Sequence, residues 1–308
     1  MNPPSDTTEP MLVFDRSAVR AHRERAAGLP AEHRFLRREV AARLIDRLAD
    51  VKGRFETVLD LGCGDGEMAD LLEAAGRPAT VISLDAARGF ARRGPRPVVA
   101  EEEALPFKPA SIDLVLSTLG LHWTNDLPGA LLQIRQILRP DGLLLAGMLG
   151  GETLHELRAA LLEAELAEES GASPRISPFA DLRDAGALLQ RAGLALPVVD
   201  ADTITVTYPD ALALMRDLRG MGETNAGRHR RRSFTRRATL LRAAAIYAER
   251  FAGPDGRIPA SFQILFLTGW APAPSQPKAL RPGSATARLA DVLGAPERGT
   301  GERTGRGV

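Results

Sequence analysis

Short apolar runs alternate with amphipathic segments along most of the chain. The runs are rich in β-branched and aliphatic residues, and they predict buried strands at 57–61, 79–84, 97–100, 113–118, 143–149, 198–206 and 262–270. The amphipathic segments carry apolar residues three and four positions apart, and they predict helices at 67–75, 128–138, 153–169 and 181–192. Strands and helices in this order predict an α/β fold with a seven-stranded, mostly parallel sheet and helices on both faces.

Further segments extend this pattern at both ends of the chain. Helical periodicity at 18–27 and 34–48 predicts two helices before the first strand, and we interpret their arginines as a solvated face. Residues 1–10 and 273–308 lack apolar periodicity, and the second range is rich in proline, glycine, serine and arginine. Both are predicted to be disordered, which leaves residues 11–272 as the predicted domain.

The sharpest local signal is a glycine-rich turn after the first predicted strand, in the stretch T-V-L-D-L-G-C-G-D-G. Asp60 lies near the end of the strand, and Gly62, Gly64 and Gly66 follow at every second position. Glycine permits a sharp turn and lets a ligand approach the main chain, because it has no Cβ. The helix predicted directly after the turn presents unpaired N–H groups to that ligand, which indicates a nucleotide-type site.

The spacing of the glycines and the position of Asp60 distinguish between nucleotide ligands. A dinucleotide fingerprint reads G-x-G-x-x-G, whereas this turn reads D-x-G-x-G-x-G. A pyrophosphate disfavours a nearby carboxylate, while an amine and a sulfonium cation, as in S-adenosylmethionine, favour one. The motif resembles the first motif of the class I methyltransferases, which implies their Rossmann-like fold and S-adenosyl-L-methionine as the cofactor. A tight turn without a ligand is the alternative interpretation.

Acidic candidates lie at the ends of the next two strands, where open parallel sheets bind ligands. Asp85 ends the second strand about 20 residues after the turn, which is the position of a ribose ligand, although it also suits a helix N-cap. In the methyltransferase pattern an acid after the third strand faces the adenine amine. Glu101 fits that position best, and Glu102 and Glu103 are alternatives.

The fourth strand leads into a second group of candidates. Leu119 directly follows this strand and is a predicted cofactor contact. His122 is a candidate catalytic residue, with an ordinary hydrogen-bonded histidine as the alternative. Trp123 is interpreted as a packing residue.

Composition and charge exclude several classes of protein. The net charge is +1, which argues against a general nucleic-acid or membrane-surface binder. No apolar run approaches about 18 residues, so no integral membrane segment is predicted. Cys63 is the only cysteine, which excludes an internal disulfide and a cysteine-rich metal site. Together with first residues that lack a basic or apolar leader pattern, it predicts a cytoplasmic location.

An insertion precedes the last strand. It spans residues 209–253 and contains predicted helices at 211–219 and 238–251. We expect G-M-G-E-T-N at 220–225 to line the substrate side of the cleft, with Glu223 as a second catalytic candidate that can hold a guanidinium group. A glycine-rich helix C-cap is the alternative. The arginine run at 228–237 has Phe234 as its only aromatic residue, so we interpret it as a mobile, solvated surface and not as a nucleic-acid patch.

Several stretches together resemble one branch of the methyltransferase superfamily. They are F-D-R at 14–16, L-D-L-G-C-G at 59–64, L-P-F-K at 105–108, L-H-W-T-N-D-L-P at 121–128, G-G-E-T-L-H-E-L-R at 150–158, I-S-P-F at 176–179 and D-L-R-G-M-G-E-T-N at 217–225. Over residues 11–286 they resemble the complex I assembly factor family typified by the mitochondrial arginine hydroxylase. The resemblance implies modification of an arginine in a quinone-site subunit of NADH:ubiquinone oxidoreductase, and therefore a protein partner.

Two further resemblances bear on the cleft and on the reaction. In class I methyltransferases N-terminal helices cover the cofactor cleft, so residues 11–50 are a candidate helical lid. A more distant resemblance is to the malonyl-carrier-protein methyltransferase of biotin synthesis. A malonyl-carrier-protein or other small-substrate O-methyltransferase is therefore one alternative function, and a non-catalytic assembly chaperone is another.

The residues themselves favour methyl transfer over hydroxylation. Hydroxylation requires an oxygen-activating centre, such as iron on two histidines and a carboxylate, or a flavin. The five histidines show no H-x-D or H-E-x-x-H spacing, so no metal site is predicted: His22, His33, His122, His155 and His229. Methyl transfer requires chiefly that a nucleophile be aligned with an activated methyl group. Hydroxylase activity is therefore implied by the resemblance alone.

Overall fold

The computed structural model describes residues 12–169, 171–277, 284, 287 and 289–296. The chain divides into two compact units, Met1–Ala273 and Pro274–Val308, and the first contains the sheet. In the second unit a short helix, α10 (Leu289–Leu293), lies within the tail that was predicted to be disordered. Of the ranges predicted to be disordered, residues 1–10, 278–283, 285–286, 288 and 297–308 lie outside the described part.

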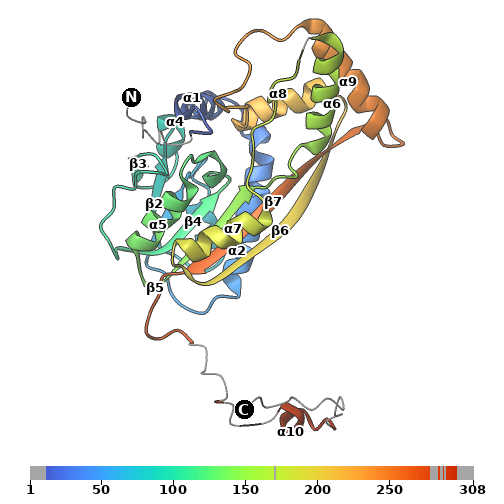
Figure 1. The fold of residues 1–308 in the computed structure, drawn as a ribbon. Helices are drawn as coiled ribbons and strands as arrows, with labels where there is room; N and C mark the ends of the chain where they lie inside the picture. The colour runs from blue at the N-terminus through green and yellow to red at the C-terminus, as the bar shows by residue number, and fades with distance from the viewer. Residues whose placement is uncertain (1–11, 170, 278–283, 285–286, 288, 297–308) are drawn as a thin grey trace, which may run out of the picture. The chain divides into compact units, whose positions relative to one another are not determined.

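All seven predicted strands form one sheet in the order β3-β2-β1-β4-β5-β7-β6 (Figure 1). Their bounds are β1 Thr57–Leu61, β2 Thr80–Asp85, β3 Pro97–Val99, β4 Ile112–Thr118, β5 Leu138–Leu149, β6 Ala195–Tyr208 and β7 Ile258–Trp270. The first five strands run parallel, whereas β7 is antiparallel to both β5 and β6. The carboxyl ends of β1, β2 and β4 therefore meet at one edge, where a site is expected.

Helices cover both faces of this sheet, each with its own hydrophobic core. One core contains α2 (Phe35–Ala49), α3 (Met68–Ala74), α6 (His155–Glu168), α8 (Ala211–Met221) and α9 (Arg237–Phe251). The other core contains α5 (Leu127–Ile137) and α7 (Leu182–Arg191). Val58 belongs to the first core and Leu59 to the second, as the alternation of side chains along a strand requires.

Four shorter or peripheral elements complete this unit, and one of them contributes Leu121 to the second core. They are α1 (Arg16–Ala27), α4 (Arg88–Ala91) and the 3-10 helices η1 (Ala31–Arg34) and η2 (Leu121–Trp123). Asp15 caps α1, because its side chain accepts a hydrogen bond from the N–H of Ala18. Ala27 of α1 and Phe90 of α4 belong to one small apolar cluster, which fixes the first helix beside the end of β2.

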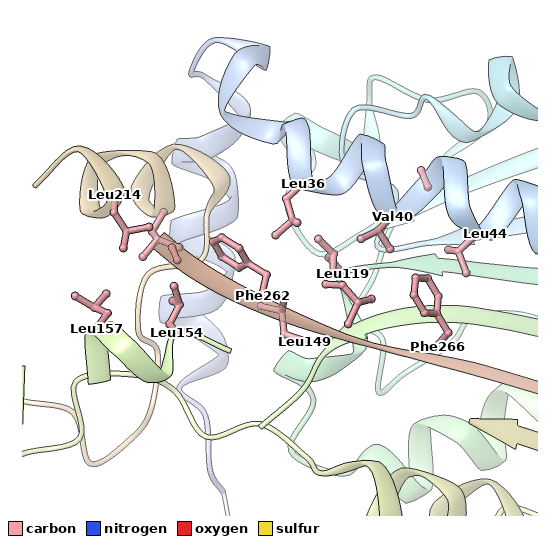
Figure 2. Close-up of a cluster of buried hydrophobic side chains, with 14 of the residues drawn as sticks. Leu36, Val40, Leu44, Leu119, Leu149, Leu154, Leu157, Leu214, Phe262 and Phe266 are labelled. Atoms are coloured by element: carbon pink, nitrogen blue, oxygen red, sulfur yellow. The ribbon is translucent and has the colours of Figure 1, made fainter. Parts of the chain in front are cut away.

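The larger core ties the N-terminal helices to the last strand (Figure 2). Leu36, Val40 and Leu44 of α2 share one buried cluster with Phe262 and Phe266 of β7. The same cluster includes residues from the site edge and the insertion, among them Leu119, Leu149, Leu154, Leu157 and Leu214. The position of α2 over the sheet therefore depends on apolar packing against β7.

The last three strands are longer than predicted. The antiparallel strands β6 and β7 pair along their full lengths, since Ala195 pairs with Trp270 and Tyr208 pairs with Ile258. β5 starts at Leu138, which pairs with Ile112 of β4 before the turn R-P-D-G. Cross-strand pairing determines these ends, and it leaves little signal in the local sequence.

Replacement of Phe262 by alanine is expected to destabilise the fold. This side chain is 1% exposed in the larger core, and a buried Phe→Ala change costs about 3–5 kcal/mol. Urea unfolding followed by circular dichroism measures the change. Phe234→Ala is the matched control, because Phe234 is 99% exposed and its loss is expected to change the unfolding free energy by less than about 0.5 kcal/mol. Equal effects of the two changes would contradict the assigned core.

Candidate active site

The glycine turn after β1 adopts the conformation that its sequence predicts. Gly62, Gly64 and Gly66 have φ values of 71°, 55° and 76°, which residues with a Cβ rarely adopt. A Cβ on Gly64 would lie 2.3 Å from Nε of Arg37, so a side chain at this position would also displace that arginine. The N–H of Gly62 donates to the carbonyl of Leu84 at 2.8 Å, which holds the turn against the end of β2.

Asp85 lies at the end of β2 and reaches the glycine turn. One carboxylate oxygen accepts a hydrogen bond from the N–H of Gly64 at 3.1 Å, and the other accepts from the N–H of Ala87 at 2.9 Å. Its guanidinium partner is Arg23 of α1, whose Nε lies 3.1 Å from Oδ1. Asp85 therefore combines a position at the turn, as for a ribose ligand, with a hydrogen bond to the helix that follows.

Asp60 is buried at the same edge, and part of its carboxylate has no partner. It is 1% exposed, and Oδ1 makes no hydrogen bond within the described residues. Burial raises the pKa of Asp60 to about 7, and the nearby Arg37 offsets this only in part. An unpartnered buried acceptor of this kind matches a ligand that donates hydrogen bonds or carries a positive charge.

Of the three consecutive glutamates after β3, Glu102 lies nearest the glycine turn. It is buried, and its Oε1 lies 3.7 Å from the position that a Cβ on Gly62 would occupy. Both Glu101 and Glu102 pair with Arg16, but the side chain of Glu101 is 32% exposed and also lies 3.6 Å from Arg20. The geometry therefore favours Glu102 over Glu101 as the acid that faces a ligand.

The end of β4 places its two hydrophobic candidates in different surroundings. Leu119 is buried with a φ of 48° and lines a small pocket with Gly64. Trp123 packs edge-on against Phe14, with ring centroids 5.4 Å apart. This contact agrees with the interpretation of Trp123 as a packing residue.

The two catalytic candidates, His122 and Glu223, are brought together. Nε2 of His122 lies 3.0 Å from Oε2 of Glu223, and their side chains are 0% and 9% exposed. Nδ1 of His122 has no partner within the described residues. Gly222, with a φ of 88°, ends α8 just before Glu223, so the C-cap that was the alternative interpretation is present as well. The cap positions the carboxylate.

Two cavities meet at Glu223. The larger has a volume of about 300 Å³ and an apolar lining that includes Leu157, Phe179 and Met215, with Thr224 and Asn225 beside Glu223. The smaller, of about 20 Å³, lies against the glycine turn and is lined by Arg23, Arg37, Gly64, Leu119 and Glu223, among others. Glu223 therefore lies between the turn and a space large enough for a substrate side chain.

The interpretation of the N-terminal arginines as a solvated face is wrong for three of them. Arg23, Arg34 and Arg37 are 4%, 3% and 8% exposed, whereas the side chains of Arg20 and Arg38 are 56% and 50% exposed. The helical periodicity contains the signal for burial that the interpretation overlooked. Arg37 precedes buried Ala41 and Leu44 by four and seven positions, and Arg23 follows Val19 by four positions, so both lie on buried faces.

The arginine run of the insertion is ion-paired and not simply solvated. Arg230 donates to Asp15 at 3.0 Å, and Arg231 lies 3.5 Å from buried Glu165 of α6 and also pairs with Glu169. Glu165 of α6 and Glu169 just after this helix are therefore partners of the loop. The pairs were not apparent from the sequence, because they join segments more than 60 residues apart.

Neither a metal centre nor a membrane-spanning helix is present among the described residues. No group of three or more His, Cys, Asp or Glu side chains there is placed to hold a metal ion. Among the same residues no helix is both long and apolar enough to cross a membrane.

Comparison with known proteins identifies the class. The methyltransferase domain family matches residues 31–197, and the chain belongs to that family, which implies S-adenosylmethionine binding. Solved structures agree with this fold: the YcgJ protein from Bacillus subtilis has a TM-score of 0.51 at 16% identity, covering 76% of this chain and 98% of its own. A putative methyltransferase from Bacillus halodurans has a TM-score of 0.50 at 13% identity, covering 75% and 99%. The predicted fold is confirmed.

Within that family the chain is similar to the protein named "Arginine-hydroxylase NDUFAF5, mitochondrial". The Danio rerio protein is 46% identical over 92% of this chain and 90% of its own length, and the Homo sapiens protein is 42% identical over 94% and 86%. The chain is also similar to the malonyl-[acyl-carrier protein] O-methyltransferase of a Methylovorus strain, at 37% identity over 86% and 92%. The predicted resemblance to the arginine hydroxylases is confirmed.

The predicted cytoplasmic location is wrong. The arginine hydroxylases of Danio rerio, Mus musculus and Homo sapiens, at 42–46% identity, are named as mitochondrial proteins. The prediction used a single cysteine and the first ten residues. A low cysteine content indicates a reducing environment and does not distinguish between reducing compartments.

The buried carboxyl of Asp60 predicts a pH-dependent stability for the ligand-free protein. Its pKa rises from 3.8 to about 7 on folding, so the folded protein keeps a proton that the unfolded chain loses. The stability that this proton contributes is fully present below about pH 4 and is lost as the pH rises through about 7, at up to about 1.4 kcal/mol per pH unit. Asp60→Asn cannot titrate and should lack this slope. Urea unfolding between pH 5 and pH 8 tests it, and parallel profiles for the two proteins would contradict it.

Proposed function

We propose that this chain binds S-adenosylmethionine at the glycine turn and modifies an arginine side chain of a protein substrate beside Glu223. The position of Glu223 is the observation that carries this proposal, because this carboxylate lines both the pocket at the turn and the larger cavity. A guanidinium in that cavity can form a charge-assisted pair with the carboxylate. The names of the relatives as arginine hydroxylases support the same substrate group.

The residues at the turn fit the cofactor. The free Oδ1 of Asp60 accepts from the amino group, Asp85 accepts from the ribose hydroxyls, and Glu102 faces the adenine side. The glycines at 62, 64 and 66 leave the main chain accessible, and Leu119 supplies an apolar contact. When bound, the cofactor supplies a methyl group that its sulfonium already activates.

His122 acts on the substrate through Glu223. In the tautomer protonated at Nε2, it donates to Oε2 of Glu223 at 3.0 Å and fixes the carboxylate toward the cavity. The ring is held in place by Phe179, with centroids 5.7 Å apart. His122 is thus a positioning residue, and Glu223 is the residue that contacts the substrate.

The resemblance to the complex I assembly factors indicates the protein partner. We propose that the target arginine belongs to a quinone-site subunit of NADH:ubiquinone oxidoreductase. Mass spectrometry of that subunit from a deletion strain and its parent tests this directly. A missing oxygen atom in the deletion strain indicates hydroxylation, and a missing methylene indicates methyl transfer.

A carrier-protein O-methyltransferase is the second candidate. The 37% identity to a malonyl-[acyl-carrier protein] O-methyltransferase supports it, as does Arg219 in the lining of the larger cavity, since a guanidinium attracts a malonyl carboxylate. Growth of a biotin auxotroph that carries this chain distinguishes the two candidates. Rescue favours the carrier-protein substrate, and failure to rescue with loss of arginine modification in the deletion strain favours the first proposal.

Asp85→Ala is expected to weaken S-adenosylmethionine binding by roughly ten- to a hundredfold. Hydrogen bonds from a ligand to a buried charged group contribute about 1.5–3 kcal/mol, and this change removes them. Isothermal titration calorimetry measures the affinity. Asp70→Ala is the control, because Asp70 is an exposed acid of the adjacent helix α3. Unchanged affinity in a folded Asp85→Ala protein would remove Asp85 from the site.

Glu223→Gln is expected to lower modification of the protein substrate by at least about tenfold while cofactor affinity stays within about twofold. The amide keeps the shape but loses the charge that pairs with a guanidinium, a contribution of about 1.5–3 kcal/mol. Mass spectrometry of the substrate subunit from complemented deletion strains gives the first quantity, and calorimetry gives the second. Glu73→Gln, at an exposed position of α3, serves as the control. Full modification by the Glu223→Gln protein would reduce this segment to a helix cap.

A further inference from the structure

Phe234 is the most exposed of the large apolar side chains among the described residues, at 99%. A single exposed side chain is ordinary on a protein surface, so its surroundings decide whether it has a role. Aromatic and arginine side chains are enriched at the centres of protein interfaces, and this ring lies within a run of arginines. The segment therefore has the composition of an interface.

The loop that carries the ring is fixed on both sides of it. This segment, the arginine loop, spans residues 228–237. Before the ring, Nε of Arg231 donates to Oγ of Ser233 at 2.8 Å. After the ring, Oγ1 of Thr235 accepts a hydrogen bond from Arg175 at 2.7 Å. The ring is therefore presented by an ordered chain, and a partner that binds it has less conformational entropy to remove.

The arginine loop lies at the rim of the larger cavity. Asn225, three residues before the loop, and Leu240, three residues after it, both line that cavity. Arg175, which holds the loop at Thr235, is a third lining residue. A protein that inserts a side chain into the cavity would therefore place its neighbouring surface against the loop.

The positive charge of the loop is only partly compensated. The loop contains six arginines, and their carboxylate partners among the described residues are Asp15, Glu165 and Glu169. Arg228 and Arg237 are exposed and form no ion pair within the described part of the chain. An exposed ring beside uncompensated cations is complementary to an apolar hollow bordered by carboxylates.

We propose that the arginine loop docks the protein substrate, with the ring of Phe234 in an apolar hollow of that protein and Arg228 and Arg237 against acidic side chains around it. The inference rests on the proposed modification of a protein beside Glu223, because the substrate then lies at the cavity. A few aromatic and arginine side chains carry most of the binding energy of many interfaces. The loop thus selects a protein by its folded surface, whereas the cavity takes one side chain.

Binding between the full chain and the quinone-site subunit tests the proposal. The subunit is purified from the deletion strain, so it is unmodified, and biolayer interferometry gives the Kd. Phe234→Ala should weaken binding at least about tenfold, and Phe234→Tyr, which keeps the ring, should bind within about threefold of the wild type. Arg237→Gln should weaken binding about two- to fivefold and lower its salt dependence.

Val99→Ala is the matched control and should leave the Kd unchanged. Val99 is an exposed apolar residue of the edge strand β3, which lies away from α6 and α9 (Figure 1). The affinity for S-adenosylmethionine, measured by calorimetry, should be the same in the wild type and in every variant. This second measurement separates docking from cofactor binding.

The possible outcomes separate this proposal from the one on which it rests. A wild-type Kd for folded Phe234→Ala overturns the docking role, and so does a wild-type dimer that Phe234→Ala converts into monomers, because the ring is then buried between two copies. Phe234-dependent binding of a subunit whose arginine stays unmodified overturns only the proposed reaction. Phe234-dependent binding of an acyl carrier protein supports the docking role and overturns the arginine substrate. Binding of neither protein overturns the docking role.

Discussion

Three carboxylates are buried at the carboxyl edge of this sheet. The packing of α1 against that edge depends on how their negative charge is compensated. Asp60, Asp85 and Glu102 lie there with little access to solvent. A buried carboxylate costs several kcal/mol unless a cation or hydrogen bonds compensate it. In the ligand-free protein Arg23 pairs with Asp85 and Arg16 pairs with Glu102, both from α1. Asp60 has no ion pair. Its burial instead raises its pKa, which favours the neutral form of the carboxyl group.

These ion pairs make α1 part of the cofactor site, and other contacts make it part of the substrate side. At its start, the N–H of Asp15 donates to the carbonyl of Ala226 at 2.8 Å, and Phe14 forms a β-bridge with Gly227. Further along, the ring of His22 lies 3.1 Å from the carbonyl of Thr224. A ligand that takes over Asp85 must displace the guanidinium of Arg23, and the same helix holds the segment that contains Glu223. Helix α1 thus contacts both the residues at the glycine turn and the segment that contains Glu223.

The sheet and the glycine turn could be predicted because their signals are local. Five residues, Thr57–Leu61, hold the strand pattern, and the glycines that follow hold the turn. The pair of His122 and Glu223 could not be predicted as a pair, because the two residues are 101 positions apart and only the packed fold joins them. Glu101 and Glu102 are neighbours of identical chemistry that both pair with Arg16, and they differ in burial, with side chains 32% and 2% exposed, which the sequence does not reveal.

The buried arginines were missed for a different reason. Arginine is almost never fully buried unless it is paired, so a solvated face is the ordinary expectation for an arginine-rich helix. The partners of Arg23 and Arg34 are Asp85 and Asp65, which follow in sequence only after the whole first strand. The amphipathic period placed Arg23 on a buried face, but it could not identify Asp85 as the acid that pairs with it.

The relatives of this chain are named for different reactions, so the residues on the substrate side bear on the choice between them. Glu223 lines both cavities, whereas Arg219 lines only the larger one. The carboxylate of Glu223 therefore lies nearer the glycine turn than the guanidinium of Arg219 does. At a separation of about 4 Å and an effective dielectric constant near 20, two unit charges interact by about 4 kcal/mol. A guanidinium gains that energy beside Glu223, and a malonyl carboxylate loses it. The charge of Glu223 therefore supports the proposed arginine substrate over an acidic one.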